Sequence, residues 1–199
     1  SEERSKDRIH FENLEFSPNW QYKNIDSGYI YQNGVIRGKV WYSESNGNAS
    51  IKDIDRMQPH LESVFREGGF KNNSYIRVVD YSNVGRSSFS NRKKYALLIK
   101  KLNDTYNTNP SVTCIVGARP FVKASMLLFS KAINQNLRFF KTRQEAFSSL
   151  TDLNTLPHTK KTVTLDMDDI QKLMEVQSRF LFEQDSTEEQ PFPEDHVLR

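Results

Sequence analysis

The residues best suited to binding chemistry follow a run at residues 75–79 whose β-branched and aromatic residues are typical of a strand. Asp80 ends this run and Ser82 follows two residues later. Ligand sites of parallel sheets lie at the carboxyl ends of the strands, and Arg92 and Arg119 can offer forked donors to an anion there. We therefore expect Asp80, Ser82, Arg92 and Arg119 to bind a protein partner or a small ligand. A lone aspartate at a strand end also caps the next turn, so that interpretation stays open.

Other reactive residue types do not form a catalytic or metal-binding pattern. The four histidines are scattered over the chain at His10, His60, His158 and His196, without a metal-ligand spacing. The segment that contains Gly117 offers one glycine after a strand, where a phosphate-binding loop needs more. We therefore expect a protein that is not an enzyme, with no cofactor and no metal.

The single cysteine and the absence of targeting signals indicate a cytoplasmic protein. Cys114 sits inside an apolar run, where a buried and inert thiol is expected, and one cysteine cannot build a disulfide framework. The chain begins with polar and charged residues rather than with the apolar core of a signal peptide. No run reaches the roughly 20 apolar residues that a membrane span needs.

An alternation of strand and helix patterns from residue 75 to residue 150 positions these side chains. Strand-like runs near residues 75–84, 112–117 and 137–142 are each followed by a segment with helical periodicity. Such alternation predicts parallel strands joined by crossover helices. Upstream, Asn33-Gly34 lies between two β-rich runs over residues 29–42 and predicts a hairpin with its turn at that pair. A helix should begin at Ser50, with Asp53 completing its cap and Pro59 kinking or splitting it.

The fold class that follows is α/β. We expect a mixed sheet of four to five strands, made of an N-terminal hairpin and parallel β-α units, with the helices mainly on one face and a C-terminal helical extension. The predicted organisation is an N-terminal arm over residues 1–28, a domain over 29–157, and a connector helix with an acidic tail over 158–199. Phe11 and Phe16 of the arm are expected to dock on the domain. The connector helix at 166–182 is a candidate dimerisation element.

Charge is distributed unevenly along the chain, although the net charge is only +3. Residues 86–143 contain twelve Lys and Arg and a single acid, Asp104, whereas the tail is acidic. Three interpretations stay open: a solvated basic face, a surface for an anionic lipid or an acidic protein segment, and a nucleic-acid surface. Nucleic acid is the least favoured, because the basic residues lie on several helices without an aromatic strand face.

The element order resembles the STAS fold of SpoIIAA-type anti-sigma-factor antagonists over about residues 29–150. The local matches are the strand that ends at Asp80, the strand and turn at residues 114–117, and the closing segment Phe139-Phe140-Lys141-Thr142-Arg143-Gln144-Glu145-Ala146-Phe147. In that family a phosphorylatable serine follows the aspartate strand. By this resemblance Ser87 and Ser88 are the phosphorylation candidates, although Arg86 and Phe89 stand where the family has Asp and Gly. Turn and helix-cap roles for these serines stay open.

The combination of Asp80-Tyr81-Ser82-Asn83 with Arg92 and a turn at Gly117 also resembles an N-terminal domain that precedes sensory histidine kinases or other signalling modules in some bacteria. Together the resemblances imply a non-catalytic sensor or regulatory module, as a fragment N-terminal to an output domain such as a histidine kinase. Two alternatives stay open. One is a free-standing antagonist switched by serine phosphorylation, and the other is a protein that binds anionic lipid or nucleotide.

Overall fold

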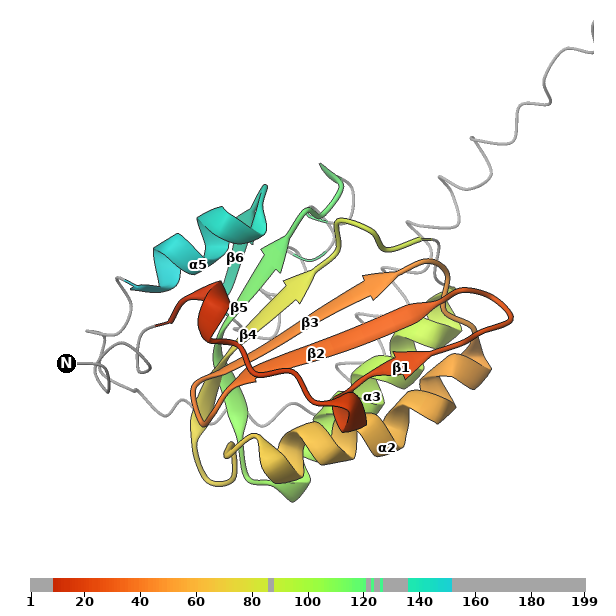
Figure 1. The fold of residues 1–199 in the computed structure, drawn as a ribbon, viewed down its shortest axis with the longest axis horizontal. Coiled ribbons are helices and arrows are strands. Elements are labelled where there is room, and N and C mark those ends of the chain that lie inside the picture. The colour runs from red at the N-terminus through yellow and green to blue at the C-terminus, as the bar shows by residue number, and fades with distance from the viewer. Residues whose placement is uncertain (1–8, 86–87, 121–122, 124–125, 127–135, 152–199) are drawn as a thin grey trace, which may run out of the picture. The chain divides into compact units, whose positions relative to one another are not determined.

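A computed structural model describes residues 9–85, 88–120, 123, 126 and 136–151, which build a six-stranded mixed sheet (Figure 1). The strands lie across the sheet in chain order: β1 (Tyr22–Lys23), β2 (Ile30–Ile36), β3 (Val40–Asn46), β4 (Ser74–Asp80), β5 (Asn109–Val116) and β6 (Leu137–Phe140). β1, β2 and β3 pair antiparallel, and β3 to β6 pair parallel. The predicted fold class is confirmed, with the short β1 as a strand beyond the four to five expected.

The helices cover both faces of the sheet. α2 (Ile51–Glu67) and α3 (Phe89–Thr105) pack on one face, while α5 (Arg143–Thr151) and the 3-10 turn η1 (Phe11–Asn13) lie on the other (Figure 1). A second 3-10 turn, η2 (Pro18–Trp20), precedes β1. Right-handed crossovers that step in one direction place their helices on one face, which explains why α2 and α3 share a face. The predicted helix near residues 121–133 and the region 158–199 lie largely or wholly outside the described residues.

Local capping chemistry fixes the start of α2 as predicted. The Ser50 hydroxyl accepts from the Asp53 N–H at 3.2 Å, and an Asp53 carboxylate oxygen accepts from the Ser50 N–H at 2.7 Å, which completes a capping box. Ile54, Met57 and Leu61 then bury one side of the helix. Pro59 lies inside a single helix of 17 residues, so the helix is not split there.

The hairpin forms, but the turn predicted at Asn33-Gly34 is wrong. Both residues lie inside β2, and the chain turns at residues 37–39, where Gly38 has a φ of 69° that suits glycine. Asn33 is fully buried. Its side-chain amide is satisfied there, because it donates to the Trp20 carbonyl at 2.7 Å and accepts from the Trp41 indole at 2.9 Å. Tertiary hydrogen bonds therefore override the local turn preference of Asn-Gly.

Each face of the sheet carries its own core. Trp41 packs edge-on against Phe65 in the core under α2 and α3, and Tyr42 lies with Phe147 in the core under α5. Cys114 is fully buried in the second core, as predicted, and burial raises the pKa of its thiol to about 12.

The segment before β1 joins the domain. Ile9 and Leu14 are buried with the core under α5 and Phe11 packs against it, whereas Phe16 is 48% exposed. Among the described residues, no helix combines the length and the apolar character that crossing a membrane requires.

Candidate functional site

The carboxyl ends of the parallel strands gather polar side chains in one row. The strand registers pair Glu44 of β3 with Asp80 of β4, and Asp80 with Val116 of β5. Side chains two apart on a strand share a face, so Tyr42 lies on the same face as Glu44. We call the group formed by Tyr42, Glu44, Asp80 and Arg143 the carboxyl-edge cluster.

Asp80 is 8% exposed, and both of its carboxylate oxygens have partners. Oδ1 accepts from the backbone N–H of Ser82 at 2.9 Å, and Oδ2 lies 3.3 Å from the hydroxyl of Tyr42. The first contact caps the turn that follows β4, and the second ties that turn to β3. Asp80 therefore positions the backbone at the strand end.

Arg143 connects the first turn of α5 with β3. Its Nη1 donates to the Tyr42 hydroxyl at 3.2 Å and to Oε2 of Glu44 at 3.4 Å. The guanidinium also lies over the ring of Phe11, with Cζ 3.9 Å from the ring centroid. Arg143 thus joins three segments that are far apart in the sequence.

The Tyr42 hydroxyl contacts every other member of the cluster. It donates to Oε2 of Glu44 at 2.7 Å. Burial raises the pKa of Tyr42 well above its usual value, although the hydrogen bond from Arg143 opposes the shift. Since the hydroxyl stays protonated at physiological pH, it acts as a fixed donor rather than as a base.

The turn at residues 80–85, which we call the carboxyl-edge turn, is bound to both neighbouring strand ends. The Gly47 N–H donates to the Asn83 carbonyl at 3.1 Å, and the Gly85 N–H donates to the Gly47 carbonyl at 2.9 Å. On the other side, a Cβ on Gly117 would come within 2.3 Å of the Ser82 hydroxyl oxygen, so the two residues are in close contact. These contacts hold the turn while Ser82 stays exposed.

The predicted site residues lie around this turn. Asp80 and Ser82 are in direct contact. Burial raises the pKa of the Tyr81 hydroxyl in this turn to about 12, and the charges of Arg77 and, to a smaller degree, Arg92 oppose the shift. Arg119 is exposed two residues beyond Gly117, at the end of β5. The binding role of these four predicted residues stays a prediction.

The two predicted phosphorylation sites differ in what the structure describes. Ser88 is exposed and caps α3, where its hydroxyl accepts from the Asn91 N–H at 3.1 Å. Ser87 lies outside the described residues. A cap role for Ser88 is one of the two interpretations that the sequence left open.

Sequence reasoning missed Tyr42, Glu44 and Arg143 as members of this edge. Tyr42 and Glu44 alternate along β3, and their place at the carboxyl end of a strand was the available signal. Arg143 gave no signal, because nothing local connects the start of α5 with β3.

A second polar network, also missed, lies on the opposite face. The Arg77 side chain is 5% exposed, and its Nη2 donates to the Ser43 hydroxyl at 2.6 Å and to the Tyr95 hydroxyl at 3.2 Å. Its guanidinium carbon lies 3.6 Å from the Trp41 ring centroid, and Nη1 donates to two carbonyl oxygens, of Trp41 and Val78. The acceptors around this buried cation are therefore neutral hydroxyls and carbonyls.

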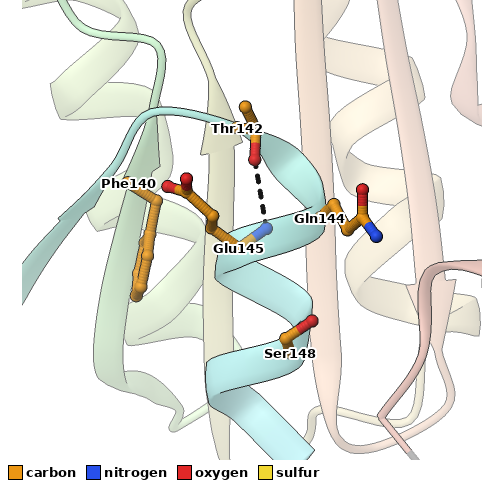
Figure 2. Close-up of a pocket in the computed structure, with 5 residues that line it drawn as sticks. All are labelled: Phe140, Thr142, Gln144, Glu145 and Ser148. Atoms are coloured by element: carbon orange, nitrogen blue, oxygen red, sulfur yellow. Dashed lines mark hydrogen bonds between the residues drawn. The ribbon is translucent and has the colours of Figure 1, made fainter.

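An open pocket of about 600 Å³ lies at the start of α5, lined by Phe140, Thr142, Gln144, Glu145 and Ser148 (Figure 2). The Thr142 hydroxyl accepts from the Glu145 N–H at 3.2 Å, and the Glu145 carboxylate accepts from the Lys141 N–H at 3.1 Å. Thr142 therefore caps the start of α5. Two of the polar side chains that line the pocket, Thr142 and Glu145, thus serve the start of α5.

Metal-binding groups do not gather in the part of the chain that the structure describes: no three His, Cys, Asp or Glu side chains there could hold an ion together.

No protein-family model and no curated protein matches the chain. Among solved structures, the chain is similar to an uncharacterized protein of the DUF3478 family with a SpoIIAA-like fold from Shewanella loihica PV-4. The two share 16% sequence identity with a TM-score of 0.43, over 69% of this chain and 93% of that chain. The mixed α/β fold stated above rests on the sheet order and strand pairing of this chain.

Proposed function

We propose that this chain is a non-catalytic regulatory module that binds a protein partner or a small anionic ligand at the carboxyl-edge turn. The observation that carries the proposal is that this turn is held from both sides, through Gly47 and Gly117, while Ser82 stays exposed. Arg92 and Arg119 supply positive charge around it. A turn ordered before binding pays little conformational entropy when a partner docks.

The signalling context extends the resemblance described above. In this proposal the chain acts in the cytoplasm, N-terminal to an output domain such as a histidine kinase. A partner bound at the carboxyl-edge turn changes how the domain holds the connector helix at 166–182. That helix, which also serves as the candidate dimerisation element, lies outside the described residues.

The binding site is tested by NMR titration of the full chain with inorganic phosphate as the probe. We expect the amide signals of Ser82, Gly85 and Gly117 to shift together. We expect Arg119→Gln to weaken binding about tenfold, because one charge-assisted contact contributes about 1.5 kcal/mol. The matched control is Lys71→Gln, an exposed cation in the loop after α2, which should change the affinity less than about twofold. Shifts that spread evenly over the basic residues, or equal effects of the two variants, would overturn the proposed site.

A second candidate function, a switch by serine phosphorylation, has one observation in its favour. Ser88 is exposed at the first turn of α3, and a phosphate at a helix N-terminus is stabilised by the helix dipole. Mass spectrometry of the protein from its native cell decides this candidate. Phosphoserine at Ser87 or Ser88 supports it, and unmodified peptides under every growth condition remove it.

A third candidate, binding of an anionic lipid or nucleotide by the basic segment 86–143, is favoured by its charge count. Part of this charge is already paired with acids of the same chain at the surface, since Lys94 pairs with Asp55 and Lys100 with Asp104. Co-sedimentation with anionic vesicles at low and high salt tests this candidate. This candidate is supported if the chain binds anionic vesicles at low salt, fails to bind neutral vesicles, and loses its binding at high salt.

A further inference from the structure

Residues 9–16, which we call the latch segment, cover the α5 face of the sheet next to the carboxyl-edge cluster. The 3-10 turn η1, which belongs to this segment, lies beside α5 (Figure 1). Ile9 and Leu14 are buried in the core there, with 2% and 8% exposed. The backbone joins the sheet at Glu15, which exchanges two hydrogen bonds with Val35 at 2.8 and 2.9 Å. Segments attached mainly by side chains can open without unfolding of the sheet.

Phe11 is the contact between the latch segment and the carboxyl-edge cluster. Its ring meets the rings of Tyr42 and Phe147 edge-on, each at 5.6 Å between centroids. The Arg143 guanidinium stacks on the same ring, with 3.9 Å from Cζ to the centroid. A guanidinium on an aromatic face is held in a defined orientation, so Phe11 helps to aim Arg143 at Tyr42 and Glu44.

From Arg143 the contacts continue to the carboxyl-edge turn. Arg143 donates to the Tyr42 hydroxyl, Tyr42 lies against Asp80, and Asp80 accepts from the Ser82 N–H, at 3.2, 3.3 and 2.9 Å. Chains of packed side chains and hydrogen bonds of this kind can carry energetic coupling between two positions.

We propose that the latch segment, docked through Phe11 on Arg143, holds the carboxyl-edge turn in its observed conformation, so that displacing the latch segment loosens the turn. A partner that captures residues 9–16 would then change binding at Ser82. That consequence rests on the proposed function, whereas the coupling itself is a property of the folded chain.

The coupling is tested by amide hydrogen exchange of the full chain without ligand, comparing wild type with Phe11→Ala. The reporters are the N–H groups of Tyr81 and Ser82, which donate to Val116 and to Asp80. The reference is the Asn72 N–H in the loop after α2, which donates to Tyr106. We expect the two reporters to exchange about tenfold faster and the reference to change less than about twofold.

Glu12→Ala is the matched control, because Glu12 belongs to the same segment but is exposed, whereas the ring of Phe16 packs against Phe11 itself. This control should leave both reporters within about twofold of wild type. Arg143→Lys is the second test variant, since lysine keeps the charge but loses the planar stack and the fork. It should accelerate the reporters as Phe11→Ala does.

Three results would overturn the coupling. In the first, the reporters are unchanged in both Phe11→Ala and Arg143→Lys. In the second, Glu12→Ala accelerates them as much as Phe11→Ala does. In the third, Phe11→Ala accelerates the Asn72 reference by the same factor as the reporters, and Arg143→Lys leaves the reporters unchanged. Because no phosphate is present, failure of the titration under the proposed function leaves this experiment unaffected.

Discussion

Asp53 is the residue at which one substitution should reveal most about how the domain is held together. It is 1% exposed, and four donors reach its carboxylate. Oδ1 accepts from the Tyr22 hydroxyl at 2.7 Å and the Asn24 amide at 2.8 Å, while Oδ2 accepts from the Ser50 N–H at 2.7 Å and hydroxyl at 2.8 Å. Burial raises the pKa of Asp53, but the hydrogen bonds led by Ser50 outweigh it and lower the pKa to about 2.

We expect Asp53→Asn to lower the free energy of unfolding by about 2–3 kcal/mol at pH 7. The amide keeps one acceptor oxygen, but its NH₂ group replaces the Oδ2 oxygen that accepts from the Ser50 N–H and hydroxyl. These two charge-assisted bonds, worth about 1.5 kcal/mol each, are therefore lost. The pKa gives a similar figure, because a fall from 3.8 to about 2 corresponds to roughly 2 kcal/mol at 1.36 kcal/mol per unit. The melting temperature should drop by about 4–12 °C for a domain of this size.

The pH dependence separates this carboxylate from a packing effect. Since the folded-state pKa lies below the unfolded one, the stabilisation is complete well above pH 3.8 and is lost as the pH falls toward about 2. Urea denaturation followed by circular dichroism should therefore show the gap between wild type and Asp53→Asn falling to about half by pH 3.

Asp55→Asn, on the same helix but exposed and paired with Lys94, is the matched control and should change stability by less than about 1 kcal/mol. A gap between wild type and Asp53→Asn below about 0.5 kcal/mol at pH 7 would refute the reasoning. So would a gap that is constant from pH 6 to pH 3.

Three further substitutions or reactions test other contacts. Arg77→Lys should lower the free energy of unfolding by about 2–4 kcal/mol in urea denaturation, because an ammonium cannot stack and fork as the buried guanidinium does; stability equal to wild type would contradict this. Gly117→Ala should cost about 2–4 kcal/mol, since its φ of 66° is strained for alanine and its Cβ would strike Ser82. Gly28→Ala, at a φ of 73° with open space around it, should cost only about 1 kcal/mol, and equal losses would refute the steric part. Cys114, whose thiol pKa burial raises to about 12, should react with a thiol reagent at pH 8 only as fast as the protein unfolds, and immediate labelling of native protein would be the opposite result.

The elements that could be predicted from the sequence are those whose signals are local. The cap at Ser50 and Asp53 and the cap at Thr142 and Glu145 use groups three residues apart, so the donor and its acceptor appear together in the sequence. The run at residues 75–79 has the length and composition of a buried strand, and β4 occupies it. The runs near residues 75–84, 112–117 and 137–142 are each followed by a helix pattern. That alternation predicts the parallel part of the sheet.

The features that could not be predicted depend on contacts between distant segments. Asn33-Gly34 has the composition of a turn, yet Asn33 binds Trp20 and Trp41 inside the core. The contact between Arg143 and Tyr42 links α5 with β3, and nothing near either residue indicates the other. The sequence therefore predicts Asp80 at the end of a strand, where β4 has it, but not the side chains that hold Asp80 in place.

The alternation of side chains along β3 and β4 explains why the domain carries polar networks on both faces. Trp41 and Ser43 of β3 meet Arg77 on the α2 and α3 face, while Tyr42 and Glu44 lie with Asp80 on the α5 face. Both faces are covered by helices or by the latch segment, so each network had to satisfy its polar groups internally. The network on the α5 face reaches the carboxyl-edge turn through hydrogen bonds, from Tyr42 to Asp80 and from the Ser82 N–H to Asp80. In the proposed coupling, a change at Phe11 or Arg143 therefore affects Ser82, whereas a change at Arg77 acts first on the stability of the opposite core.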